Sequence, residues 1–205
     1  GSSAASDVYK RQPLPTSATI KAKSKVTGLV DKGADKGALI LTERTLKDAE
    51  SGLDLATLTS TTFARGNGGY DGPSDEAPRP HKVPEREPDF AVDLTTLDMA
   101  ALIYRLSGDY NPLHASPSVA RAAGFPKPIL HGLCSLGVAG HAILKGCCDY
   151  DAKRLKSLQL RFSSPVYPGE TMRTEIWRDG ANISFKSKIV ERDVVVLDNG
   201  HAIVE

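Results

Sequence analysis

The hydrophobic and polar positions of the first half of the chain predict a small antiparallel sheet. Alternation and β-branched residues indicate strands at 19–30, 38–45 and 53–63, and polar turns at 31–37 and 48–52 separate them. Strands joined by such turns form a meander. A meander of three strands cannot bury both of its faces alone, so we expect it to pack against a helix or another sheet.

The second half has a different order of elements. A strand at 89–94 is followed by a helical segment, in which Thr96 is a candidate N-cap for the first helix. We expect helices at 97–106 and 118–123, and a third, rich in glycine, at 133–145. Strands are then expected at 155–162, 170–178, 183–190 and 194–197, with turns at 179–182 and 198–201. This half is therefore predicted to be an α+β unit.

A proline-rich segment separates the two patterns. Residues 71–88 hold five prolines among charged side chains, which is typical of an extended, semi-rigid linker. We therefore expect two units, a partial one at 13–70 and a second one at 89–205.

The first 12 residues are expected to lie outside both units. Residues 1–6 are small and polar, as in a tag, and residues 7–12 (DVYKRQ) resemble the conceptual translation of a transposon sequencing adaptor. The hypothesis is that the gene is a metagenomic fragment whose authentic sequence starts near Pro13. A real N-terminal arm is the alternative, and the coding DNA would decide between them.

Composition excludes several classes of protein. The chain has 205 residues, 40% of them hydrophobic and 25% charged, with a net charge of +1. This balance is typical of a globular protein and gives no reason to expect nucleic acid or an anionic membrane as partner. No apolar run approaches the roughly 20 residues that span a bilayer. The three cysteines fit neither a zinc site nor a disulfide framework, which favours a reducing compartment.

Candidate chemistry begins at 107–114 (SGDYNPLH), where an acid, an amide and an imidazole lie within six residues. Gly108 and Pro112 should end the preceding helix and leave a short loop. If Asp109 and His114 converge, they can hold one water and transfer a proton to or from it. A surface turn in which Asp109 is only a cap is the alternative.

A second candidate lies at 128–140, where a proline leads into a small, apolar helix. The first N–H groups of a helix have no intrahelical partner, so the Gly132 N–H can bind a negatively charged oxygen. The alternative is that glycine is needed here for close packing. We interpret His131 as a packed core histidine, outside the catalytic set.

Three segments in this order resemble the hydratase 2 motifs of MaoC-like enzymes: 104–114 (YRLSGDYNPLH), 127–134 (KPILHGLC) and 160–171 (LRFSSPVYPGET). The resemblance is to the (R)-specific 2-enoyl-CoA hydratase found in peroxisomal multifunctional enzyme type 2 and in bacterial relatives. It implies a hot dog fold, in which an antiparallel sheet wraps around a central helix. It also implies a double hot dog with an incomplete first unit, which lacks the strand and helical segment expected before the meander.

The resemblance further implies reversible addition of water to trans-2-enoyl-CoA, which gives (3R)-3-hydroxyacyl-CoA. Asp109 and His114 would activate the water, and Gly132 would bind the thioester oxygen. Further substrate-binding positions are Asn111, Tyr110, Pro112, Leu113, Phe162 and, for the CoA moiety, Lys32, with Lys36, Arg65 and Asn67 as weaker candidates. CoA is part of the substrate, so no cofactor and no metal are expected.

Two other functions stay open: an acyl-CoA thioesterase of the hot dog fold, and a non-catalytic acyl-CoA-binding or assembly fragment. An incomplete first unit would leave a sheet edge or face uncovered, so we expect a homo-oligomer. The ending Val204-Glu205 is not a peroxisomal tripeptide. A bacterial cytoplasm is therefore expected, with the peroxisome as the alternative for a eukaryotic source.

Overall fold

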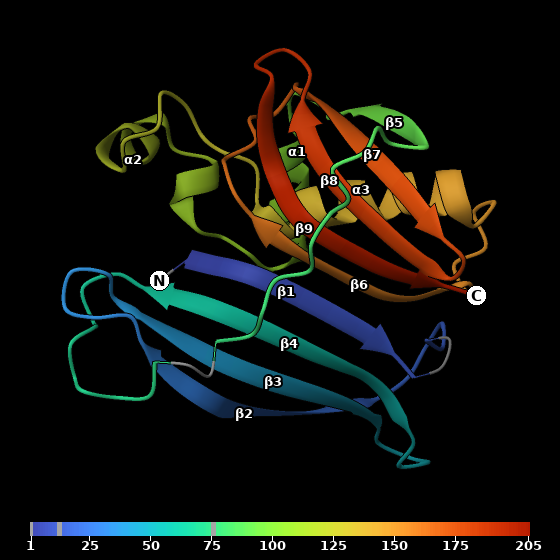
Figure 1. Cartoon of the computed structure of the whole chain (residues 1–205), viewed down its shortest axis with the longest axis horizontal. Helices are drawn as coiled ribbons and strands as arrows, with labels where there is room; N and C mark the ends of the chain where they lie inside the picture. The colour runs from blue at the N-terminus through green and yellow to red at the C-terminus, as the bar shows by residue number, and fades with distance from the viewer. Residues whose placement is uncertain (1, 12–13, 75–76) are drawn as a thin grey trace.

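In the part of the chain that the structure describes, nine strands form one antiparallel sheet in the order β2-β3-β4-β1-β6-β9-β8-β7-β5 (Figure 1). The structure is a computed structural model that describes residues 2–11, 14–74 and 77–205. The strands are β1 (Ser2–Lys10), β2 (Ile20–Asp31), β3 (Ala38–Asp48), β4 (Asp54–Ala64), β5 (Phe90–Thr95), β6 (Leu155–Phe162), β7 (Thr171–Asp179), β8 (Asn182–Ile189) and β9 (Val194–Val204). The helices are α1 (Ala100–Tyr104), η1 (Arg105–Ser107), η2 (Pro112–His114), α2 (Pro117–Ala122) and α3 (Gly132–Cys147).

The sequence correctly predicts the meander of the first unit, because β2, β3 and β4 pair in order. It does not predict β1, which lies between β4 and β6 and joins the two units into one sheet. Val8, for example, is opposite both Leu58 and Leu158.

The expectation that residues 1–12 lie outside both units is therefore wrong for Ser2–Lys10, because these residues form a strand of the shared sheet. The run SSAASD gave no strand signal, because it lacks large apolar residues. The adaptor hypothesis concerns the gene and stays a prediction.

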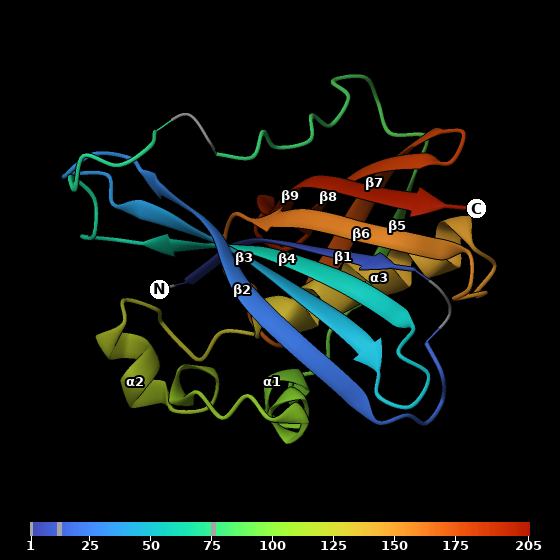
Figure 2. The same ribbon diagram turned by 90° about the horizontal axis from the view of Figure 1, so that it is seen from below.

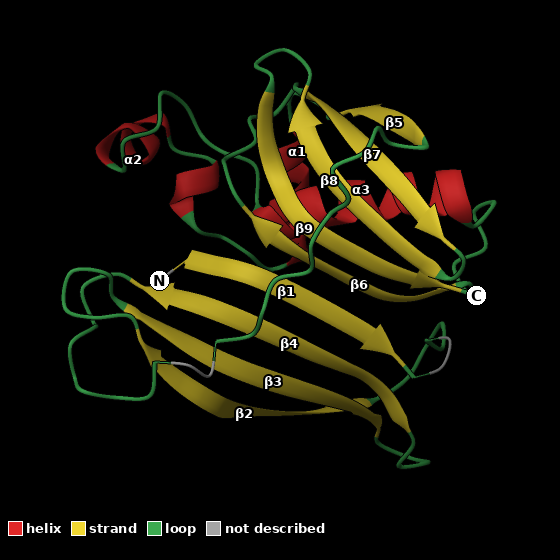
Figure 3. Ribbon diagram, viewed as in Figure 1, coloured by secondary structure: helices red, strands yellow, loops and turns green. Residues whose placement is uncertain are grey.

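The core of the second unit forms where α3 packs against β5, β6, β7 and β9 (Figure 3). Helix residues Ala139 and Ile143 are fully buried there together with Ile183 and Phe185 of β8. The helix can lie close to the sheet because it is rich in glycine. A Cβ on Gly140, for example, would be 3.2 Å from a methyl group of Leu158. An antiparallel sheet around a central helix, in an α+β chain, is therefore confirmed.

Two local predictions are wrong. Thr96 does not cap a helix: its hydroxyl donates to the carbonyl oxygen of Glu170 (3.0 Å) and accepts from the N–H of Gly169 (3.0 Å). The segment 198–201 is not a turn between strands but an irregularity within β9, where the pairing with β6 and β8 shifts. Asn199 has a φ of 54° there, a conformation that asparagine tolerates both in turns and in such bulges.

The linker crosses the face of the sheet opposite α3 (Figure 2). His81 fixes it to β8 and β9, since its Nε2 lies 2.8 Å from the Ser184 hydroxyl and its carbonyl oxygen accepts from Asn199 (2.7 Å). Near the end of the linker, the Trp177 indole donates to the carbonyl oxygen of Arg86 (2.8 Å). In the described part of the chain, no helix has the length and apolar character needed to cross a membrane.

Candidate active site

The loop that carries the candidate acid and base begins where η1 ends at Gly108. This glycine has a φ of 103°, which L side chains rarely adopt, so the helix stops here. Asn111 then starts η2, because its side-chain oxygen accepts a hydrogen bond from the Leu113 N–H (3.0 Å). The Arg105 guanidinium donates to the carbonyl oxygen of Asn111 (3.1 Å) and ties the loop to the preceding helix. The break at Gly108 and the loop are therefore as predicted.

Asp109 and His114 converge, together with His131. A carboxylate oxygen of Asp109 and one ring nitrogen from each histidine all lie within 4.8 Å of one another. His114 is only 9% exposed, whereas Asp109 is exposed to solvent. The arrangement can thus place a water molecule between a carboxylate and an imidazole.

The contacts of His114 determine which of its nitrogens can accept a proton. Its Nδ1 lies 2.8 Å from the carbonyl oxygen of Ile129. A carbonyl oxygen only accepts, so Nδ1 must carry the hydrogen. In the neutral ring, Nε2 then has the free electron pair. His114 is therefore oriented as a proton acceptor at Nε2.

His131 belongs to this cluster, which the sequence analysis did not predict. It is 2% exposed, and its ring stacks on that of His114 with centroids 3.7 Å apart. Its Nε2 lies 3.3 Å from the carbonyl oxygen of Asp109. Burial and the neighbouring His114 lower the pKa of His131. In the sequence, the position of His131 directly before Gly132 was the one sign that it could belong to the site. That position does not distinguish a core histidine from one in the site.

Gly132 is the first residue of α3 and lies at the surface. Its N–H has no partner within the helix, and the helix dipole places a partial positive charge at this end. The ring of Phe162 lies against it, since a Cβ on Gly132 would be 3.3 Å from a ring carbon. Glycine thus keeps the N–H accessible beside a half-buried aromatic side chain, and both interpretations of Gly132, donor and close packing, are compatible with the structure.

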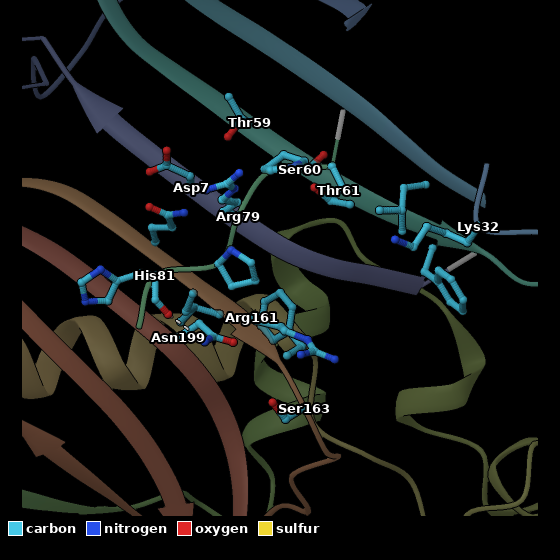
Figure 4. Close-up of a pocket in the computed structure, with 18 of the residues that line it drawn as sticks. Asp7, Lys32, Thr59, Ser60, Thr61, Arg79, His81, Arg161, Ser163 and Asn199 are labelled. Atoms are coloured by element: carbon cyan, nitrogen blue, oxygen red, sulfur yellow. Dashed lines mark hydrogen bonds between the residues drawn. The ribbon is translucent and has the colours of Figure 1, made fainter. Parts of the chain in front are cut away.

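A pocket of about 670 Å³ lies between the linker and strands β1, β4 and β6 (Figure 4). Phe162 and Lys32 both line it, so the structure brings these two predicted residues to one cavity. Asp109, His114 and Gly132 are not among the described residues that line this pocket. Phe162 contacts both the pocket and the start of α3, but the linker closes the pocket on the face of the sheet opposite α3 (Figure 4).

Asp31 holds the turn that carries Lys32. Its carboxylate accepts from the backbone N–H groups of Gly33 (2.8 Å) and Gly69 (2.7 Å), and these hydrogen bonds lower the pKa of the carboxyl group. The turn after β2 and the turn after β4 are thereby fixed together. Lys32 itself is exposed and lines the pocket from this rim.

Four of the described side chains that line the pocket are those of lysine or arginine, and the sequence analysis missed two of them. Arg65 was a weak candidate, whereas Arg79 of the linker and Arg161 of β6 were not considered. Together with Lys32 these residues have no ion-pair partner within the described part of the chain. Arg161 could have been noticed as the direct neighbour of Phe162.

Three further predicted residues, Tyr110, Pro112 and Leu113, lie on the loop and do not line this pocket. Tyr110 is 64% exposed, and the Arg105 guanidinium lies over its ring at 5.6 Å. Pro112 is the first residue of η2, and Leu113 is half-buried. Lys36 lines a smaller hollow of about 410 Å³ that it shares with Lys32.

The Asp109, His114 and His131 cluster has residue types that metals bind, but its geometry opposes a shared ion. Imidazole binds a metal through an electron pair in the plane of the ring. The two rings are stacked at an interplanar angle of 25°, so their electron pairs run side by side rather than toward one point. Each ring also has one nitrogen at a backbone carbonyl oxygen.

Comparison with known families matches both units. Residues 80–200 match the model of the MaoC like domain, and residues 5–66 match that of the MFE-2 hydratase 2 N-terminal domain. The first match covers the loop, α3 and the strands after it.

Similar proteins agree with these matches. The chain is 42% identical over 194 residues to 3-hydroxyacyl-thioester dehydratase Y of Mycobacterium tuberculosis (92% of this chain, 67% of that protein). It is 40% identical over 200 residues to the peroxisomal enoyl-CoA hydratase 2 of Arabidopsis thaliana (93% and 63%). The chain thus spans about two thirds of the length of these relatives.

Solved structures give the fold. A MaoC-like dehydratase from Phytophthora capsici superimposes with a TM-score of 0.93 at 40% identity (99% of this chain, 71% of that chain). A Mycobacterium tuberculosis protein described as a double hot dog has a TM-score of 0.65 at 15% identity (99% and 74%), a likeness of fold alone. The chain therefore belongs to the MaoC-like family with a hydratase 2 N-terminal domain, and its fold is the double hot dog.

Proposed function

We propose that this protein catalyses the (R)-specific, reversible hydration of trans-2-enoyl-CoA to (3R)-3-hydroxyacyl-CoA. The observation that carries the proposal is the convergence of the Asp109 carboxylate with the oriented His114 imidazole, beside His131, the residue directly before α3. The names of the similar proteins, enoyl-CoA hydratase 2 and 3-hydroxyacyl-thioester dehydratase, support it.

In this mechanism, one water is held between Asp109 and His114. One of the two groups takes a proton from the water as its oxygen bonds to C3 of the enoyl thioester. Electrons move through the double bond toward the thioester oxygen, which the Gly132 N–H stabilises as negative charge develops there. A proton is then delivered to C2, and the protonation states of the two side chains are restored. Dehydration follows the same steps in reverse.

The CoA part of the substrate is proposed to bind in the pocket that Lys32 and Phe162 share. Phosphate groups on CoA are anionic, and Lys32, Arg65, Arg79 and Arg161 surround this pocket. Lysine binds phosphate as a point charge and arginine as a planar fork.

The test is a hydration assay with crotonyl-CoA and a longer trans-2-enoyl-CoA, which follows the loss of enoyl absorbance. Coupling the product to a (3R)-specific or a (3S)-specific dehydrogenase then reports its stereochemistry. We expect turnover and coupling with the (3R)-specific enzyme only. Release of free CoA thiol would instead indicate the thioesterase. Binding of enoyl-CoA without any turnover would indicate the non-catalytic fragment, and either outcome would refute the proposal.

We also propose that copies of the chain associate. Strand β2 is an edge of the sheet, and its apolar residues Ile20, Val26 and Leu29 are between 49% and 61% exposed. An edge strand with unpaired backbone groups and exposed apolar residues favours self-association. Light scattering at micromolar concentration is the measurement, and a monomer would contradict this proposal.

A further inference from the structure

His131 is a buried titratable group within the candidate site that the proposed mechanism does not use. It lies directly before Gly132, stacks on His114 and contacts the main chain of Asp109. We propose that His131 is a positioning residue for the hydration reaction: its uncharged ring holds the His114 imidazole in its proton-accepting orientation, and its Nε2–H holds the backbone of Asp109. This inference rests on the proposed function and deepens it.

The contacts of His131 assign its proton. The carbonyl oxygen of Asp109 can only accept, so the nitrogen 3.3 Å from it, Nε2, carries the hydrogen. Its Nδ1 is buried and has no hydrogen-bond partner among the described residues. A second proton on Nδ1 would therefore place a charge and an N–H group where nothing accepts them. The contacts of the ring thus favour the neutral form.

The groups around His131 agree with a neutral ring. Tyr104 packs against it with ring centroids 4.6 Å apart, and burial raises the pKa of that tyrosine, so it too is uncharged at neutral pH. Cys134 lies close to Tyr104, and burial also raises the pKa of its thiol. Arg105 is the nearby cation and is hydrogen-bonded to Asn111. The negative group is Asp109, whose carboxylate is at the surface.

A neutral His131 has two consequences for His114. Two stacked imidazolium rings at 3.7 Å would repel each other, so a charged His131 would prevent His114 from taking a proton. A neutral aromatic face instead attracts the cation that His114 becomes. The same ring fixes His114 between itself and the Ile129 carbonyl oxygen. His131 thus acts on both of the groups that are proposed to hold the water.

The kinetic test is a double-mutant cycle in the full chain, with hydration of enoyl-CoA as the readout. We expect His131→Ala to lower kcat about 10-fold or more, the effect typical of a residue that orients a catalytic side chain, with little change in KM. In a His114→Gln background, the same substitution should lower kcat by a smaller factor, because the part of its effect that passes through His114 is already lost and only the part through Asp109 remains. His141→Ala is the control, an exposed histidine on the same helix.

Two further variants keep the test valid if His131→Ala does not fold. His131→Phe keeps the stacked face and loses the donor to Asp109, whereas His131→Gln keeps a donor and loses the ring. Each is expected to retain more kcat than His131→Ala. Equal losses in both His114 backgrounds, or a kcat unchanged by every substitution of His131, would overturn the proposal.

A second readout does not depend on activity. Nitrogen-15 NMR of the wild-type chain at pH 7 should show the Nδ1–H form of His114 and the neutral Nε2–H form of His131. A charged His131 at this pH, or the opposite pair of tautomers, would overturn the inference. If the wild type lacks hydratase activity, the proposed function fails, and the NMR result still decides the state of this histidine pair.

Discussion

The two units of this protein share one sheet but differ in what covers it. The main core cluster lies entirely between Val92 and Val204, where α3 fills the curve of the sheet. Among the residues of the first unit whose burial the structure describes, the buried hydrophobic ones are few: Val30, Ala38, Leu55 and Ala56. None of the described helices packs on β2 or β3 to a comparable extent. One unit is thus a packed core, and the other is largely an extension of its sheet.

Under the proposed function, the two units divide the work of the site. The acid, the imidazole and the backbone donor all come from the unit with the core, on a loop and a helix that packing holds in place. The other unit contributes Lys32, Arg65 and one wall of the pocket. Chemistry requires geometry fixed within a fraction of an ångström, whereas charge attraction to phosphates tolerates a softer support.

The largest expected effect is on catalysis in the second unit. Asp109→Asn and His114→Gln should each lower kcat by about 10²- to 10⁴-fold, the contribution of a general acid or base, with the melting temperature nearly unchanged. Asp151→Asn is a matched control, because Asp151 also accepts from the N–H two residues later (2.9 Å) but lies outside the site. Near wild-type turnover in either variant would remove that residue from the mechanism.

The next largest effect is on the free energy of unfolding, which we compare for one leucine substitution in each unit. Leu197 (1% exposed) belongs to the second core, and Leu55 (3% exposed) belongs to the first unit. Leu197→Ala should lower the free energy of unfolding by about 4–5 kcal/mol, near the upper end for this substitution. Leu55→Ala should cost about 2–3 kcal/mol, because fewer packed neighbours leave a smaller lasting cavity. Denaturant unfolding measures both, and equal costs would contradict the comparison.

A smaller effect is expected at the cationic rim of the first unit. Lys32→Ala should raise KM for enoyl-CoA about 2- to 5-fold and leave kcat unchanged, since an exposed ion pair contributes roughly 0.5–1 kcal/mol. Lys23→Ala, an exposed lysine on β2, is the control. An enoyl-pantetheine substrate, which lacks the nucleotide phosphates, should abolish the difference. If Lys32→Ala acts equally on both substrates, Lys32 does not bind phosphate.

The smallest effect concerns the junction between linker and second unit. Hydrogen bonds from Arg86 and from the Arg178 N–H lower the pKa of Asp89 to about 2. An unfolded aspartate titrates near 3.9, so these bonds stabilise the fold above about pH 4 and are lost as pH falls toward 2. Asp89→Asn should lower Tm at pH 7 by no more than about 4 °C. That difference from wild type should shrink between pH 4 and pH 2, and one that grows instead would contradict the assignment.

The sequence by itself determined the meanders, the helical segment between β5 and β6 and the loop at 108–114. These follow from local causes: alternation along strands, the positive φ at Gly108 and the constraint at Pro112. The three motifs also led to the family. Local signals failed at Thr96 and at 198–201, where contacts across the sheet, to Glu170 and to β6 and β8, outweigh the preference of the residues themselves.

Only the tertiary structure decided which side chains meet. His131 looked like a core residue because its neighbours in sequence are apolar, yet its ring lies against His114, 17 positions earlier. Arg79, Arg161 and Lys32 come from three distant segments and reach one pocket because β1 joins the two units in a single sheet. Such encounters depend on strand order and on the path of the linker, and no local pattern in the chain encodes either.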